Sequence, residues 1–231
     1  MYRVDAVDFE HASDRSILLE ELDRQLLKGS ADYAFAPLAI DKVTTIRSMV
    51  DHGWTQIESR VTYRRNDLSS FTPKRRSRLR EATPDDLPAL WEIAVAAKNP
   101  LDRFHGDPFY TQAQVEDLMK EWLRTSVQHE FADCVLVPAT SVCAFMTLRY
   151  NKDQWTSNGE RISRLVLNAV HPRAHGWYPK LVSETLFHLK EVGAATAVIT
   201  TQAANRPVIR TLEFLGFVPT TATTILRKIY G

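Results

Sequence analysis

The two ends of the chain repeat one local pattern, and this repeat limits the folds that the sequence can adopt. Placing Gly53 on Gly216 aligns the residues around them without a gap and makes four positions identical. The aligned pairs are Ile46 with Ile209, Arg47 with Arg210, Met49 with Leu212, Trp54 with Phe217, Arg64 with Arg227 and Arg65 with Lys228. Both segments predict a helix, a glycine and a strand, so we interpret the repeat as an ancient duplication of one α/β unit.

The residues before position 66 predict a small α/β unit. Apolar residues alternate in the expected strands and recur at helical spacing in the expected helices, which end near Gly29 and Gly53. In chain order we expect a strand at 3–10, a helix at 13–28, a strand at 33–40, a helix at 42–52 and a strand at 56–65. The order is therefore βαβαβ.

The remaining residues predict a longer series of elements. Thr83 before Pro84 is a typical helix start, and Thr111 with Gln114 has the spacing of a second capping box. After these two helices we expect strands at 132–137, 142–150 and 162–171, a helix carrying Val182, Leu186 and Leu189, a strand at 196–201, a helix at 207–215 and a strand at 220–229. With a strand in front, the order is βααβββαβαβ.

A basic segment separates the two series. Lys74, Arg75, Arg76, Arg78 and Arg80 fall within seven residues, beside serines and a proline. This composition is typical of a solvated linker. We therefore expect a front half at 1–66, a basic linker at 67–77 and a larger domain at 78–231.

Composition excludes several classes of protein. Lysines and arginines number 29 against 28 acidic residues, a net charge of +1, so no global charge attracts nucleic acid. We expect no membrane span, because no apolar run approaches the roughly 18 residues that a bilayer requires. No signal peptide is expected from the first residues. Cys134 and Cys143 lack metal or redox spacing, so we expect reduced thiols, no metal and a cytoplasmic location.

Several short motifs resemble a known superfamily. The element order after the linker is that of the Gcn5-related N-acetyltransferases, and three stretches are similar to them: residues 165–172, His175-Gly176, and 202–205 ahead of 214–217. Residues 102–109 and 201–205 more narrowly resemble the TDP-fucosamine acetyltransferases, which also carry a truncated acetyltransferase half in front. The resemblance implies an α/β (α+β) acetyltransferase fold, with a mixed central sheet and flanking helices behind a truncated half.

The resemblance implies how the acyl donor, acetyl-CoA, would be held. Donor and amine would react in one ternary complex, with catalysis by positioning and oxyanion stabilisation. Backbone amides around Asn168 and Val170 would serve the thioester and the pantetheine arm, with His171 next to them. The apolar side chains of this strand are also typical of a core strand. Both interpretations can hold, because the hydrogen-bond donors are main-chain amides.

The loop expected to hold the CoA pyrophosphate departs from the family pattern. The matching residues are His175, Gly176, Trp177, Tyr178, Pro179 and Lys180, so side chains stand at both later glycine positions. A Cβ at Tyr178 or Lys180 should hinder close approach or any positive φ, which would weaken binding. Lys180 is either a phosphate partner or a solvated lysine.

Two further positions leave alternatives open. Leu212 stands where the family places the tyrosine that protonates the departing thiolate; Tyr178 or His175 could substitute, or both could be surface or lid residues. Asn205 either contacts the pantetheine arm or caps the helix that contains Pro207.

The loop between the first two helices of the larger domain is the expected acceptor site. Arg103, Phe104, His105 and Asp107 would combine a guanidinium for phosphate, an imidazole and a carboxylate for an ammonium, which suits a nucleotide-linked aminosugar. The alternative is an internal pair of Arg103 with Asp107.

The leading hypothesis is thus an N-acyltransferase that moves an acetyl group from CoA to a nucleotide-linked aminosugar. One alternative uses an acyl carrier protein as donor; another is a decarboxylase or a pseudoenzyme that only binds. The front half is expected to complete the sheet and to offer a homodimer surface.

Overall fold

The computed structural model describes residues 1–5, 14–150, 152, 155 and 159–230, so most of the strand expected at 3–10 lies outside the described residues. The front elements are β1 (Tyr2–Arg3), α1 (Arg15–Lys28), β2 (Tyr33–Ala39), α2 (Val43–Asp51), β3 (Thr55–Arg65) and the 3-10 turn η1 (Leu68–Ser70). The others are β4 (Leu79–Glu81), the 3-10 turn η2 (Pro84–Asp86), α3 (Leu87–Ala96), α4 (Gln112–Val127), β5 (Cys134–Pro138), β6 (Ala144–Arg149), β7 (Ile162–Val170), α6 (Trp177–Glu191), β8 (Thr196–Gln202), α7 (Arg206–Phe214) and β9 (Val218–Ile229).

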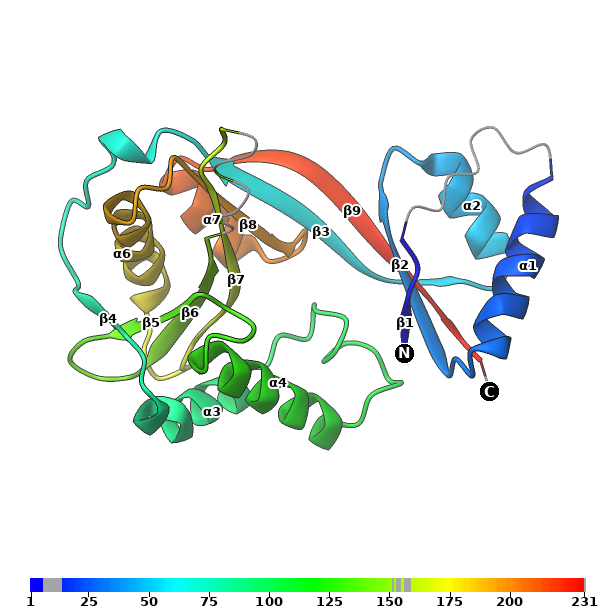
Figure 1. Ribbon diagram of the computed structural model, residues 1–231, viewed down its shortest axis with the longest axis horizontal. Helices are drawn as coiled ribbons and strands as arrows, with labels where there is room; N and C mark the ends of the chain where they lie inside the picture. The colour runs from blue at the N-terminus through cyan, green and yellow to red at the C-terminus, as the bar shows by residue number, and fades with distance from the viewer. Residues whose placement is uncertain (6–13, 151, 153–154, 156–158, 231) are drawn as a thin grey trace.

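The described strands form one mixed nine-stranded sheet that joins two lobes (Figure 1). The strand order is β1-β2-β9-β3-β8-β7-β6-β5-β4. In the smaller lobe α1 and α2 lie beside β1 and β2, whereas α3, α4, α6 and α7 belong to the larger lobe. The long strands β3 and β9 cross from one lobe to the other (Figure 1), and they pair antiparallel. The expected mixed sheet with flanking helices is confirmed.

The repeat extends well beyond the residues that reveal it in the sequence. The offset that places Gly53 on Gly216 also places β2 on β8, α2 on α7 and β3 on β9. It maps the pair Phe35–Arg227 onto Val198–Arg64, which has the same register. The pair Arg60–Thr223 maps onto itself, so an approximate twofold axis passes beside it.

The two copies exchange strands across this axis. β9, from the end of the chain, lies between β2 and β3, while β3, from the front half, lies between β9 and β8. Each long strand thereby completes the sheet of the other copy. The front half and the larger domain consequently share hydrogen bonds along two complete strands.

The two faces of the larger lobe's sheet are covered by different helices. Cys134 and Leu136 of β5 pack in the cluster that contains α6 and α7, whereas Val135 and Val137 pack in the cluster that contains α3 and α4. This period of two is the pattern of a strand buried on both faces. The sheet and its two helical layers therefore leave little room for a ligand except where strands separate.

The basic segment is fastened to α6 rather than freely solvated along its length. Phe71 is buried. Arg76 pairs with the buried Glu184 at 3.0 Å and stacks on Phe187, with its guanidinium carbon 3.8 Å from the ring centre. The amide of Ser77 also donates to Glu184 at 2.6 Å. The segment thus runs along the helix that begins at the expected donor loop.

The expected capping box at Thr83 makes the stability of the larger lobe depend on pH. Asp86 accepts the Thr83 amide at 2.8 Å and pairs with Arg80 at 2.7 Å; its hydrogen bond from Arg80 is the main reason why its pKa falls from 3.8 to about 2. A depressed carboxyl pKa stabilises the fold above the unfolded pKa and stops doing so as pH falls through the folded pKa. Wild-type protein should therefore lose about 2 kcal/mol from this group between about pH 5 and pH 2.

Urea unfolding at several pH values checks this expectation by comparing wild type with Asp86→Asn. The variant should lack that part of the acid destabilisation, whereas Asp85→Asn, at an exposed neighbour, should retain it. Parallel pH curves for wild type and Asp86→Asn would contradict the prediction.

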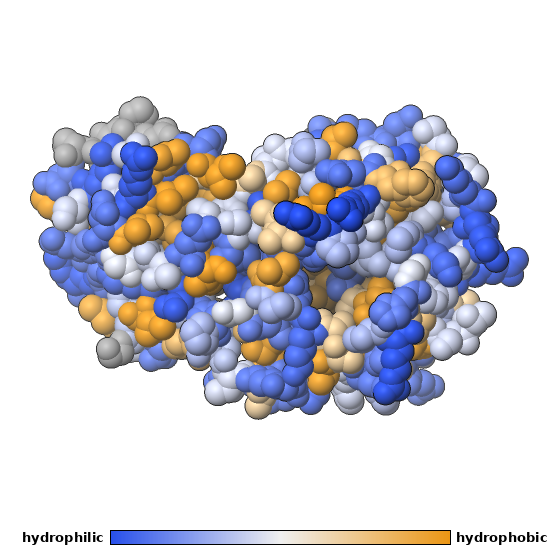
Figure 2. Space-filling model, turned by 180° about the vertical axis from the view of Figure 1, so that it is seen from behind, coloured by the Kyte–Doolittle hydropathy of each residue, from blue (hydrophilic) through white to orange (hydrophobic). Residues whose placement is uncertain are grey.

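Apolar side chains gather on the visible face of the smaller lobe, at the left of Figure 2. The exposed large apolar residues at described positions up to 52 are Met1, Tyr2, Ile17, Leu18, Leu27, Ile40, Val43 and Val50. In the part of the chain that the structure describes, no helix combines the length and apolarity needed to cross a bilayer.

Candidate active site

The site lies where β7 and β8 separate. These parallel strands pair from Ile162–Thr196 to Leu165–Ile199, and the pairing ends there although β7 continues to Val170. Of the last five residues of β7, Asn168, Ala169 and Val170 pair with β6, and none pairs with β8. One edge of this segment therefore borders an opening in the middle of the sheet.

A bulge in β7 determines which amides face the opening. The register with β6 changes between Leu165 and Asn168, and within this interval Leu167 donates its amide to the Thr147 hydroxyl at 2.8 Å. Beyond the bulge the amide of His171 donates toward β6, to Cys143 at 2.9 Å. Because successive amides of a strand point to opposite edges, those of Asn168 and Val170 point into the opening.

The opening is a cleft of about 640 Å³, and it brings together residues that are far apart in the sequence. The expected site residues that line it are Arg103, Phe104, His105, Asn168, Val170, Tyr178 and Asn205. Those that do not line it are Asp107, His171, His175, Gly176, Trp177 and Lys180. The expected strand amides, one loop tyrosine and most of the acceptor loop thus meet in one place.

The expected donor loop accommodates its side chains by starting a helix early. Gly176 is the N-cap of α6 with a φ of 79°, and open space surrounds the position of an added Cβ. Tyr178 and Lys180 lie inside the helix, so the left-handed conformation falls only on the glycine that is present. No side chain caps this helix start. The Trp177 amide donates to the Ala174 carbonyl at 3.2 Å and Pro179 has no amide hydrogen, so within the first three helical residues the Tyr178 amide is the one left for a ligand.

Tyr178 lines the cleft and has a buried hydroxyl. Its ring packs against the cluster of α6 and α7, and its buried hydroxyl has no hydrogen-bond partner among the described residues. Burial raises the pKa of Tyr178. The side chain is therefore a protonated donor without an internal acceptor.

Lys180 lies in a second, more open cavity of about 480 Å³ between the basic segment, α6 and α7. Arg65, Lys74 and Arg75 also line it. Phe214, over which the Lys74 ammonium lies at 5.7 Å, forms part of its wall. The cations of the basic segment and the helix-start lysine therefore share one surface.

Asn205 and Leu212 have contrasting environments on α7. Asn205 is the N-cap residue, but its side chain makes no capping hydrogen bond and the residue lines the cleft. The capping alternative is therefore not what the structure contains. Leu212 is fully buried in the core beneath the cleft.

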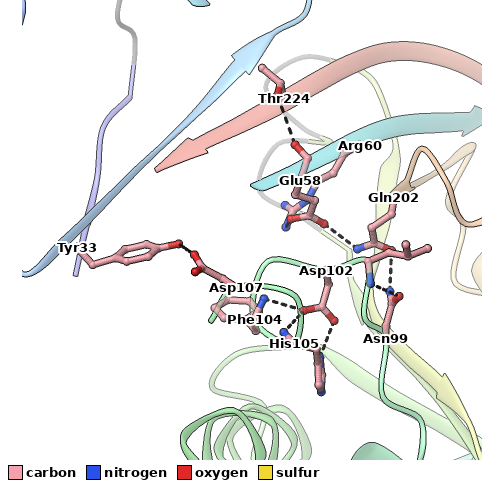
Figure 3. Close-up of polar contacts among 11 residues, drawn as sticks. Tyr33, Glu58, Arg60, Asn99, Asp102, Phe104, His105, Asp107, Gln202 and Thr224 are labelled. Atoms are coloured by element: carbon pink, nitrogen blue, oxygen red, sulfur yellow. Dashed lines mark hydrogen bonds and ion pairs between the residues drawn. The ribbon is translucent and has the colours of Figure 1, made fainter. Parts of the chain in front are cut away.

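The acceptor loop holds a histidine in a defined orientation. Nδ1 of His105 lies 2.8 Å from one carboxylate oxygen of Asp102, whose other oxygen accepts the amides of Phe104 and His105 at 2.8 and 2.9 Å (Figure 3). Nε2 of His105 has no hydrogen-bond partner among the described residues. Gly106 closes the loop tightly, because an added Cβ would lie 2.7 Å from the Pro100 carbonyl oxygen.

Polar groups from both halves connect along one side of the cleft (Figure 3). Asn99 donates to Gln202 at 2.9 Å, Gln202 donates to Glu58 at 2.8 Å, and Glu58 pairs with Arg60 at 2.6 Å. The side chain of Glu58 is 0% exposed, so this carboxylate is neutralised inside the protein. Strand β3 of the front half thereby supplies a wall of the cleft.

Asp107 does not face the cleft, and its partners lie in the smaller lobe. Its fully buried carboxylate accepts a hydrogen bond from the Tyr33 hydroxyl at 2.9 Å (Figure 3). It also lies 2.9 Å from Nε of Arg227. The alternative of an internal Arg103–Asp107 pair is therefore wrong. Asp107 joins the acceptor loop to β2 and β9.

The other residues expected to hold the donor do not line the cleft. His171 lies 3.7 Å from Glu92 and is largely buried, His175 is exposed, and Trp177 stacks under the Lys180 ammonium at 5.1 Å. Of the two substitutes suggested for the missing tyrosine, only Tyr178 lines the cleft.

Sequence reasoning missed Asp102, Glu58 and Arg60 as parts of the site. The sequence did contain an indication for Asp102, because this residue stands three positions before His105 in the predicted acceptor loop. Glu58 and Arg60 stand two residues apart on one face of an otherwise ordinary strand. Their importance depends on the strand exchange, which the sequence pattern does not indicate.

The sheet opens between two parallel strands and has helices on both faces. No family model matches the sequence, and no curated protein does. Solved structures do match. One is a GCN5-related N-acetyltransferase from Sphaerobacter thermophilus, with a TM-score of 0.64 and 13% identity over 98% of this chain and 73% of that one.

Two other solved structures are informative. A tandem GNAT protein from the clavulanic acid biosynthesis pathway matches with a TM-score of 0.58 and 13% identity, over 96% of this chain and 73% of that one. A GCN5-related glucosamine N-acetyltransferase region of a fungal multi-domain β-N-acetylglucosaminidase matches with a TM-score of 0.66 and 11% identity, over 96% of this chain and 28% of that one. The chain has the fold of the GCN5-related N-acetyltransferases.

Proposed function

We propose that the protein is an N-acyltransferase that transfers an acyl group from a CoA thioester to an amine. The observation that carries this proposal is the separation of β7 from β8, with the amides of Asn168 and Val170 directed into the cleft between them. An amide that points into the cleft suits the oxygen of a carbonyl that becomes negative during attack, and the second amide on the same strand edge can serve the pantetheine arm.

The residues around the cleft fit an acyl-CoA. The uncapped start of α6 offers the amide of Tyr178 to a pyrophosphate, and Lys180, Lys74 and Arg75 offer cations in the second cavity. The side chain of Asn205, which makes no capping hydrogen bond, can serve the amide groups of the pantetheine arm. When bound, acyl-CoA supplies an activated acyl group on a thiol that is a tolerable leaving group.

Two side chains of this protein can move the protons that the reaction requires. His105, held by Asp102 through Nδ1, leaves Nε2 to accept a proton from the attacking amine. Tyr178 holds its proton because burial raises its pKa, and it donates that proton to the departing sulfur. Acceptance and donation thus occur on different elements, the α3–α4 loop and α6.

For the acceptor we propose a nucleotide-linked aminosugar. Residues 102–109 and 201–205 resemble the TDP-fucosamine acetyltransferases, and both segments contribute residues to the cleft, which supports this acceptor. The fungal protein region with the same fold is a glucosamine N-acetyltransferase, which supports an aminosugar as the class of acceptor. Carbohydrate amines therefore come first in a substrate screen.

The test begins with calorimetric titration of acetyl-CoA into the full chain, followed by an assay of CoA thiol release with nucleotide-linked 4-amino-4,6-dideoxyhexoses, glucosamine and amino acids. We expect micromolar binding and thiol release that depends on an aminosugar. Absence of binding at millimolar acetyl-CoA would reject the proposal. Release with an acylated carrier protein alone, or decarboxylation without an amine, would replace it with the corresponding alternative.

Replacing Tyr178 with Phe should lower kcat about 10²-fold, the lower end of the range for a general acid, because a thiol leaves moderately well without help. KM for both substrates should change little, since the ring remains. Steady-state kinetics check this, with Tyr63→Phe, at a buried tyrosine outside the cleft, as the matched control. An unchanged kcat in Tyr178→Phe together with a fall in His175→Gln would assign the proton to His175.

A further inference from the structure

One side of the cleft carries a positive charge that the protein does not neutralise. Arg103 and Arg60 both line the cleft. Arg60 is paired with Glu58, whereas the guanidinium of Arg103 makes no hydrogen bond or ion pair with any described residue, and its Nε is buried without a partner. Burial, followed by the charge of Arg60, lowers the pKa of Arg103.

The surroundings of Arg103 hold it in place without compensating its charge. Its guanidinium carbon lies 3.9 Å from the ring centre of Phe35 on β2 and 4.5 Å from that of Phe104. Stacking of this kind orients the planar group and leaves its edge free for hydrogen bonds. The two carboxylates of the loop pair with other residues: Asp102 with His105, and Asp107 with Arg227.

We propose that Arg103 and Arg60 form an anion subsite, which binds a phosphate or carboxylate group of the acceptor. A buried guanidinium without a partner is costly unless a ligand supplies the opposite charge, and a planar guanidinium matches both anions with two parallel hydrogen bonds. This inference rests on the proposed function for the identity of the ligand as the acceptor. It narrows that acceptor to an amine that carries a negative group.

The subsite gives the front half a part in substrate recognition. Phe35 comes from β2, and Arg60 and Glu58 come from β3, next to the approximate twofold axis. Only the strand exchange carries β3 to the edge of β8, where Arg60 pairs in register with Gln202. The front half is therefore a component of the acceptor site as well as a completion of the sheet.

The test uses the full chain without any acyl-CoA, so that it is independent of transferase activity. Calorimetry with pyrophosphate, UDP, dTDP and succinate compares wild type with Arg103→Gln, Arg103→Lys and the double variant Arg60→Gln/Glu58→Gln, each checked for folding by circular dichroism. Loss of a charged hydrogen-bonding pair should weaken anion binding about 10- to 100-fold in Arg103→Gln, with partial recovery in Arg103→Lys. Arg124→Gln, at an arginine on the surface of α4, should bind as wild type does.

The outcomes separate the sources of the anion. Nucleotide binding that Arg103→Gln weakens supports a phosphate-bearing acceptor, and succinate binding that it weakens, without nucleotide binding, supports a carboxylate-bearing one. Anion binding that survives both substitutions and disappears in Lys180→Gln would overturn the subsite and assign the anion to the second cavity. Weakened anion binding in a protein that releases no thiol with any amine would reject the proposed function and leave the subsite standing.

Discussion

Replacing His105 with Gln should lower kcat/KM for the amine by about 10²- to 10⁴-fold, the usual range for loss of a general base. Gln fills similar space and can still hydrogen-bond, but it cannot accept a proton from the attacking nitrogen. His129→Gln, at an exposed histidine outside the cleft, is the matched control.

Asp102→Asn tests whether the carboxylate acts through the histidine. Asn at this position can still accept the amides of Phe104 and His105, so the loop should keep its shape. The histidine, however, loses the charged acceptor that orients Nδ1, and kcat should fall about 10²-fold while KM stays the same. A loss confined to KM in both variants would mean that the pair only binds the acceptor. Wild-type kinetics in His105→Gln would remove it from the mechanism.

Replacing Asp107 with Asn should destabilise the protein by about 3–5 kcal/mol, the effect expected when one partner of a buried ion pair is removed. The Asp107 carboxylate is fully buried, and Arg227, which is 16% exposed, would keep its charge without a counterion. The Tyr33 hydroxyl would also lose its charged acceptor. Urea unfolding measures the difference. Asp117→Asn, whose side chain is 79% exposed, should change stability by less than about 0.5 kcal/mol.

Kinetics of Asp107→Asn separate a structural role from substrate binding. At a temperature where the variant is folded, its KM for the amine should stay close to that of wild type, because Asp107 does not line the cleft. A stable variant with a greatly raised KM would contradict this account and return Asp107 to the acceptor site.

Local signals in the sequence predict most of the elements. The capping boxes at Thr83 and Thr111 mark two helix starts, and both are present in the structure. Gly176 and Gly193 bracket α6 because each adopts a positive φ next to a helix end. Such signals depend on neighbouring residues, so a single sequence contains them.

Pairing between strands that are distant in the sequence is harder to predict from the sequence. The repeat indicates two related units, yet it does not reveal that each unit's last strand completes the other's sheet. The same limit affects the site. Asp107 was expected to meet an ammonium or Arg103, and only the position of β9 shows that Arg227 is its partner. A buried carboxylate pairs with a cation that lies close to it, and the strand exchange is what brings Arg227 close to Asp107.

The exchanged strands also bear on how the chain reaches its native state during synthesis. In the smaller lobe, β9 is the antiparallel neighbour of β2. This edge of β2 therefore has no partner until the residues around Arg227 have left the ribosome. Contacts between such distant positions are slow to form, since the intervening chain must first be brought together. The first lobe to be made is thus the last to be completed, and until then the bare edge of β2 is a natural place for chaperones to bind.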